Sequence, residues 1–130
     1  MKNVQRIERG WIGHFILADR CKFRRNTLLI CGNTKIVIST VGLLENTIRK
    51  PLLIDKSEPF MEVGFNRYFE TMAFHAKRKD TRYYDADVSR QINFDSPWSI
   101  DKIDADDKAN EMHELVIAEL TCKLLNREIK

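Results

Sequence analysis

The sequence predicts an α+β fold, in which an antiparallel sheet of about five strands is covered by one C-terminal amphipathic helix. Three observations lead to this prediction. Two hairpin patterns and an N-terminal run are rich in β-branched and aromatic residues, as strands are. Apolar residues near the C-terminus recur at steps of three and four, as in a helix. The chain has 130 residues, so we expect one domain over 1–130.

The first hairpin has the clearest turn in the chain. Two strand-like runs within residues 27–41 flank the pair Gly32 and Asn33. Glycine at the first central position favours a type II′ turn, which places Leu29 opposite Ile36. Both faces of this hairpin are apolar, so we expect it at the centre of the sheet.

The second hairpin joins strand-like runs at 67–77 and 82–94. A two-residue turn would place carboxylates opposite core residues. A three-residue loop, 79–81, instead places Phe74 opposite Ala86, and we predict this register because it keeps apolar side chains together.

The C-terminal helix is defined by one apolar stripe. We expect Asp104 or Ser99 to cap its N-terminus, and Leu115 and Ile117 to widen the stripe. His113, one residue off the stripe, is expected at its periphery. The stripe that packs on the sheet consists of Ala109, Met112, Val116, Leu120 and Leu124.

The remaining segments have weaker patterns. Residues 11–18 are predicted to be an N-terminal strand, and the charged residues 19–25 a connection. A short strand is expected at 52–54, and a loop at 56–66.

Charge and cysteine content narrow the class of protein. Residues 1–50 hold ten basic and three acidic side chains, whereas residues 96–130 hold five and eight. We interpret this mainly as an acidic helix lying near basic strands.

Cys21, Cys31 and Cys122 are odd in number and lack CxxC spacing, so we expect free thiols, with Cys122 in the core. No signal peptide or membrane span is predicted, which favours the cytoplasm.

A basic stretch is the best binding candidate in the sequence. Arginine donors suit phosphate oxygens, and an exposed aromatic ring can stack on a base. This arrangement would serve a nucleic acid or nucleotide, although a net charge of +3 does not favour a dedicated DNA-binding protein. The residues are Arg20, Lys22, Phe23, Arg24 and Arg25.

A second candidate lies on the polar face of the second hairpin. The predicted register places His75 opposite Asp85, with Asp87 on the same face. A histidine oriented by a carboxylate is half of a general-base arrangement. A small hydrolase or phosphate-processing enzyme could use these three residues, but the sequence offers no nucleophile beside them.

The sequence as a whole favours a non-enzymatic binding protein that acts through a surface on another macromolecule. It contains no phosphate-binding loop, zinc-ligand spacing or nucleophile elbow, and we predict no cofactor and no metal. The partner is expected to be another protein or an anionic ligand. A homodimer through an open sheet edge or through the exposed hairpin face is an alternative. In size alone the chain is similar to small accessory proteins of bacteria and mobile elements.

Overall fold

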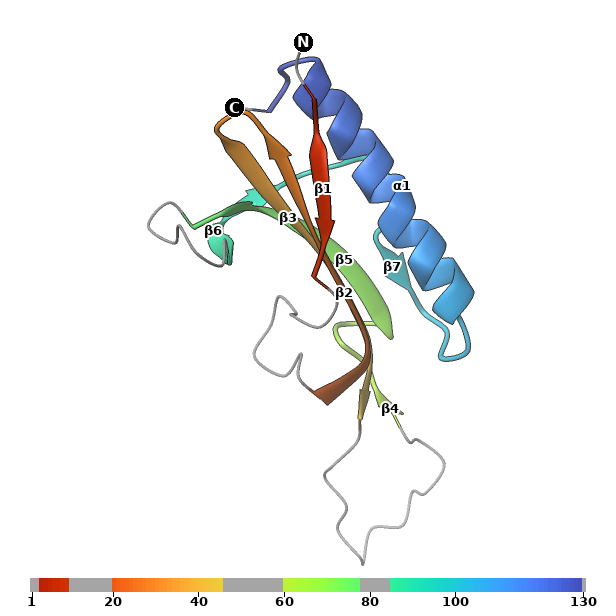
Figure 1. Cartoon of the computed structure of the whole chain (residues 1–130). Helices are drawn as coiled ribbons and strands as arrows, with labels where there is room; N and C mark the ends of the chain where they lie inside the picture. The colour runs from red at the N-terminus through yellow and green to blue at the C-terminus, as the bar shows by residue number, and fades with distance from the viewer. Residues whose placement is uncertain (1–2, 10–19, 46–59, 78–84, 130) are drawn as a thin grey trace, which may run out of the picture.

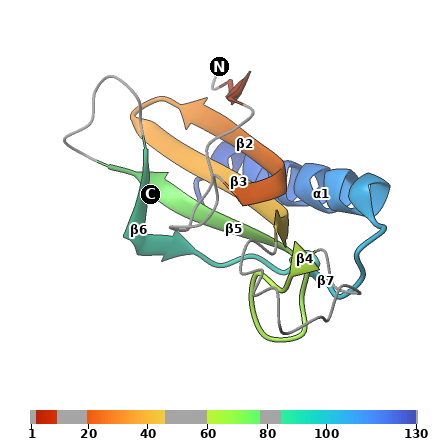
Figure 2. The same ribbon diagram turned by 90° about the horizontal axis from the view of Figure 1, so that it is seen from below.

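The computed structural model describes residues 3–9, 20–45, 60–77 and 85–129 (Figure 1). In these ranges, seven strands form one open antiparallel sheet, and helix α1 (Asp106–Leu125) lies across one face of it. Figure 2 shows α1 behind β2 and β3. The predicted α+β class, with one C-terminal helix on an antiparallel sheet, is confirmed.

Five strands lie side by side in the order β1-β2-β3-β5-β6, while β4 adds to β3 and β7 adds to β5. The predicted strands at 11–18 and 52–54 lie outside the described residues. The strand bounds are β1 Gln5–Glu8, β2 Cys21–Cys31, β3 Thr34–Glu45, β4 Phe60–Met61, β5 Phe69–Ala76, β6 Ala86–Ile92 and β7 Ser99–Ile100.

The first hairpin forms as predicted, with Leu29 opposite Ile36. Gly32 has a φ of 60°, which fits the first central position of a type II′ turn. The predicted connection at 19–25 is wrong, because β2 begins at Cys21 and pairs with β3 along its whole length. Cross-strand pairing therefore outweighs the high charge of this segment.

The second hairpin has a different register from the predicted one. Phe74 pairs with Gln91, whereas Ala76 pairs with Ala86, and the ladder is irregular between these positions. Asp87 accepts hydrogen bonds from the backbone and hydroxyl of Ser89. Such local bonds compete with strand pairing, and β6 has three more residues than β5 between these two pairings.

Helix α1 buries the predicted apolar stripe, together with Ile117. Leu115 is exposed, so it does not widen the stripe as predicted, and Cys122 is also exposed rather than in the core. The residue before the helix is Ala105, which provides no side-chain cap, so neither predicted cap is used. All three cysteines are free thiols, as predicted.

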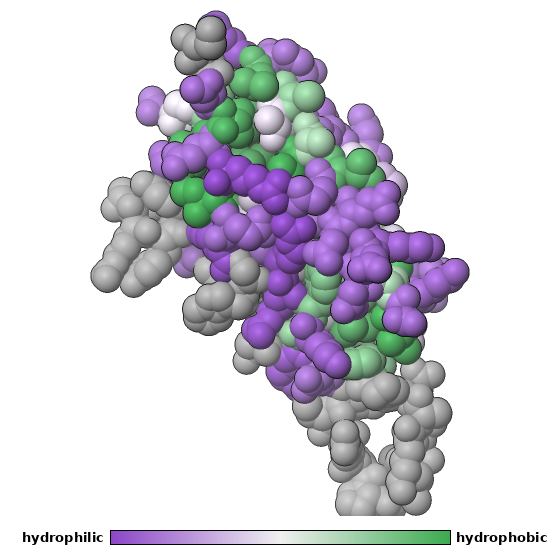
Figure 3. All heavy atoms as spheres, turned by 45° about the vertical axis from the view of Figure 1, so that its right-hand side comes forward, coloured by the Kyte–Doolittle hydropathy of each residue, from purple (hydrophilic) through white to green (hydrophobic). Residues whose placement is uncertain are grey.

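Both faces of the central strands are buried. On the helix side, Val116 and Leu120 pack with Leu29 and Ile36 in the largest core cluster, and Val37 is buried on the opposite face. On the face that Figure 3 shows, hydrophilic side chains form a band with apolar side chains grouped on both sides of it.

Candidate functional site

A tight turn between β4 and β5 presents a large aromatic side chain to solvent. Gly64 and Arg67 form a bridge across the turn, and Asn66 has a φ of 56°, as the third residue of a type II turn does. The Asn66 backbone N–H donates to the Glu62 carboxylate at 2.8 Å. The turn is therefore fixed by its own hydrogen bonds, and Phe65 at its tip is 85% exposed.

Arg67, at the end of this turn, is held from several sides. Its Nε donates to Oε2 of Glu70 at 2.7 Å, and its Nη1 donates to the carbonyl of Phe65 at 3.3 Å. The guanidinium carbon lies 5.0 Å from the centre of the Trp98 ring, a cation–π distance. A Cβ at Gly64 would collide with the guanidinium, so glycine is needed for this packing.

Arg67 thus links the Phe65 carbonyl to the Trp98 ring, and we call Phe65, Arg67 and Trp98 together the aromatic–arginine surface. Trp98 is 44% exposed, and its carbonyl accepts a hydrogen bond from the Thr71 backbone at 2.8 Å. Since this bond continues the β5–β7 ladder, the sheet itself fixes the position of the tryptophan.

A pocket of about 320 Å³ lies beside the aromatic–arginine surface. It occupies the stretch of β5 between its pairing with β6 and its pairing with β7, and we call it the β6–β7 pocket. The pocket is lined by Arg67, Glu70, Thr71, Met72, Gln91, Ile92, Asn93, Phe94 and Trp98. The wall thus combines an ion pair, an aromatic ring and two amides.

Glu119 of α1 anchors the segment that joins β6 to β7. Its carboxylate accepts hydrogen bonds from the backbone of Asp95 and from both the backbone and the hydroxyl of Ser96, at 2.6–3.1 Å. Lys123 lies 3.1 Å away. Burial alone would raise the pKa of Glu119, but these donors outweigh it and lower the pKa to about 2. The helix therefore holds one wall of the pocket.

A buried polar network joins α1 to three strands. His113 is fully buried, which corrects its predicted peripheral position. Its Nε2 lies 2.8 Å from the Thr27 hydroxyl, and its Nδ1 lies 2.6 Å from the Thr40 hydroxyl. Thr40 in turn lies 2.6 Å from the hydroxyl of Thr71.

The Glu8 carboxylate at one end of this network determines which group donates each of its hydrogen bonds. The Thr27 hydroxyl donates to the Glu8 carboxylate at 2.9 Å, so its oxygen is left to accept from Nε2–H of His113. Nδ1 of the neutral imidazole must then accept from Thr40, which accepts from Thr71. Burial, aided by the nearby Arg25 cation, lowers the pKa of His113 to about 4.

Two residues of the basic stretch predicted from sequence make contacts within the fold. The Arg25 guanidinium donates to Glu8 at 2.8 Å and to Glu114 at 2.9 Å. Phe23 packs edge to face on Phe69. The pairing of Arg25 with Glu114 of α1 bears out the interpretation that the acidic helix complements basic strands.

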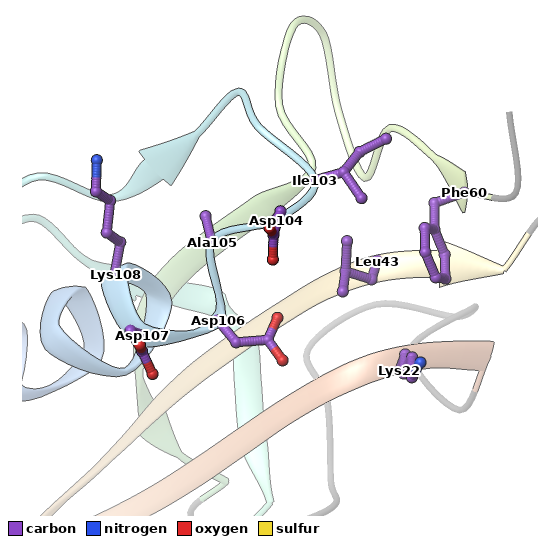
Figure 4. Close-up of a pocket in the computed structure, with 9 residues that line it drawn as sticks. All are labelled: Lys22, Leu43, Phe60, Ile103, Asp104, Ala105, Asp106, Asp107 and Lys108. Atoms are coloured by element: carbon purple, nitrogen blue, oxygen red, sulfur yellow. The ribbon is translucent and has the colours of Figure 1, made fainter.

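Of the other three residues in the stretch, Arg20 and Arg24 are half-buried. Lys22 lies 5.9 Å from the centre of the Phe60 ring. Lys22 also borders a pocket of about 600 Å³ at the start of α1 (Figure 4). Asp104, Asp106 and Asp107 line this pocket, and their charges disfavour a phosphate there.

The polar face of the second hairpin is not arranged as the sequence predicts. The backbone carbonyl of Asp85 accepts from Lys77, so Asp85 lies opposite Lys77 rather than His75. Asp87 is on β6, where its hydrogen bond from Ser89 lowers its pKa. Across the described ranges, no group of three His, Cys, Asp or Glu side chains is placed to hold a metal ion.

Comparison with known protein families, curated proteins and solved structures finds no match for this chain. Among the described residues, no helix has both the length and the apolar character needed to cross a bilayer.

The sequence predictions missed the aromatic–arginine surface, although part of its signal is local. Gly64 and Asn66 surround Phe65, and glycine with asparagine commonly marks a turn. An aromatic residue between two turn formers is a reason to expect an exposed side chain. The approach of Trp98 to Arg67 has no such signal, because these residues meet only through the sheet.

Proposed function

We propose that this protein is a non-enzymatic binding protein that engages another protein through its aromatic–arginine surface. The observation that carries the proposal is Phe65, which is 85% exposed at the tip of a turn fixed by hydrogen bonds. An apolar side chain held in water gains free energy when a partner covers it. Because the turn is already ordered, binding would cost little conformational entropy.

The composition of the surface supports a protein partner. Tryptophan and arginine are the residues most often found at the energetic centres of protein interfaces, and phenylalanine is also enriched there. Here Arg67 is stacked on Trp98, and Phe65 is two residues away in the same turn. Polar amides at Gln91 and Asn93 border the surface, as the polar rim of an interface does.

The alternative functions have less support. In the basic stretch, Arg25 and Phe23 have partners within the fold, which leaves fewer groups for a nucleic acid. The hydrolase alternative was derived from a register that sets Asp85 opposite His75, whereas Ala76 pairs with Ala86 in the structure.

The proposal is tested by affinity capture with the tagged protein in native-source lysate, with nuclease treatment and cross-linking. Phe65→Ser is compared with the wild type and with Val88→Ser, which removes a 66% exposed apolar side chain outside the surface. We expect recovery of a protein partner to fall roughly thirtyfold for Phe65→Ser, the effect of losing about 2 kcal/mol. Val88→Ser should leave recovery unchanged. Equal recovery by the two variants would contradict the proposal.

A further inference from the structure

We infer that the β6–β7 pocket receives a carboxylate side chain of the bound protein, and that Arg67 recognises it. This inference rests on the proposed function, which it extends by naming the chemistry of the partner. It is carried by the remaining donors of Arg67, by its fixed position and by the size of the pocket.

The guanidinium of Arg67 has N–H donors that are not used by its contacts within the fold. Of its five N–H groups, Nε donates to Glu70 and Nη1 donates once to the carbonyl of Phe65. In the part of the chain that the structure describes, Nη2 of Arg67 makes no hydrogen bond. Nη1 therefore keeps a second N–H and Nη2 keeps both of its own, and these donors can serve a carboxylate.

The position of Arg67 is set before any ligand arrives. Trp98 covers one side of the guanidinium, Gly64 lies against it, and Glu70 holds Nε. A free arginine side chain loses much rotamer freedom on binding, whereas a fixed one loses little. The fixed position therefore favours a ligand that fits one edge of the guanidinium.

The neighbouring carboxylate of Glu70 does not prevent this binding. The Glu70 side chain is only 7% exposed, whereas that of Arg67 is 27% exposed. The cation is therefore the more accessible of the two charges. The amides of Gln91 and Asn93, both exposed, can donate further hydrogen bonds to it.

The volume of the pocket is sufficient for an acidic side chain. Its 320 Å³ lies at the small end of the usual range for ligand pockets, roughly 300–1,000 Å³. Met72 and Trp98 also line the pocket and offer apolar contact. The structure thus fits an acidic residue that has apolar neighbours in the partner chain.

The test uses the full-length protein and a capped tripeptide, acetyl-Leu-Glu-Leu-amide, with the Nε–H NMR signal of Arg67 as readout. Counterparts with Gln or Lys at the centre, a phosphoserine counterpart, and free glutarate are titrated in parallel. We expect the Glu peptide to shift the Arg67 signal and to bind roughly tenfold more tightly than the Gln peptide.

Two variants separate recognition from folding. Arg67→Lys keeps the charge but lacks the paired donors, and Gly64→Ala displaces the guanidinium while leaving its chemistry intact. Both should weaken binding of the Glu peptide roughly tenfold, whereas Arg127→Lys, at the exposed end of α1, should not. Thermal unfolding of each variant reports whether the fold is retained.

The inference is overturned if the Gln peptide binds as well as the Glu peptide, or if Arg67→Lys binds both normally. Tighter binding of the phosphoserine peptide, or of free glutarate, would also overturn it by assigning the pocket to another ligand. These outcomes are distinct from a failure of the proposed function, which is decided by the recovery of partner with Phe65→Ser.

Discussion

Replacing His113 with glutamine separates the hydrogen bonding of this buried histidine from its titration. Glutamine can donate from its amide nitrogen toward Thr27 and accept at its oxygen from Thr40, so it can keep both hydrogen bonds of the imidazole. It cannot take up a proton in the accessible pH range. The variant therefore keeps the polar network while removing its titration.

The magnitude follows from the two pKa values of His113. The ordinary pKa is 6.5, and burial lowers it to about 4 in the folded protein. Between these values the unfolded chain binds a proton that the folded chain does not, so stability falls as the pH is lowered from 6.5 toward 4. Between pH 7 and pH 4 the wild type should lose about 3 kcal/mol through His113, at 1.36 kcal/mol per pKa unit.

The carboxylates near His113 also make the protein less stable as the pH falls. Their contribution must be subtracted to obtain that of the histidine. The pKa of Glu114 is lowered to about 2 by hydrogen bonding to Arg6. Burial alone would raise the pKa of Glu8, but hydrogen bonds from Arg25 and Thr27 outweigh it and lower this pKa. Their contribution to stability is likewise lost as the pH falls. Both chains contain these carboxylates, so the difference between wild type and His113→Gln isolates the histidine.

The assay is urea unfolding followed by tryptophan fluorescence at pH 7, 6, 5 and 4. At pH 7 we expect His113→Gln to be less stable by about 1–2 kcal/mol, because the amide fills the site less well than the ring. Toward pH 4 the difference should shrink and then reverse. Nitrogen NMR of the wild type should show the Nε2–H tautomer. Parallel pH profiles for the two chains, or the Nδ1–H tautomer, would refute this reasoning.

Two further changes test the packing of the sheet and the anchoring of the pocket. Gly42→Ala should destabilise the fold by about 2–3 kcal/mol, because the new Cβ would collide with the buried ring of Phe69; unchanged urea unfolding would show that the ring can move aside. Glu119→Gln should cost about 1–2 kcal/mol, since it weakens the charge-assisted bonds from Ser96. Hydrogen exchange should then rise at the backbone N–H groups of residues 95–96, and unchanged exchange there would contradict the anchoring role.

The register of the second hairpin was decided by the tertiary structure. The sequence pattern allows several registers between β5 and β6, and the predicted one keeps every apolar residue beside another. The structure instead has an irregular stretch of β6, in which Asp87 accepts a hydrogen bond from the backbone of Ser89. A side chain that can replace a ladder bond removes the penalty that would otherwise fix the register.

What the sequence by itself determined is local: the turn at Gly32, the pairing of Leu29 with Ile36, and the apolar stripe of α1. Each depends on residues within a few positions of one another, where period and turn geometry leave little choice. The burial of His113 and the meeting of Arg67 with Trp98 were decided only in three dimensions. These contacts join residues about 30 to 90 positions apart, and they exist because the sheet brings separate strands and the helix into contact.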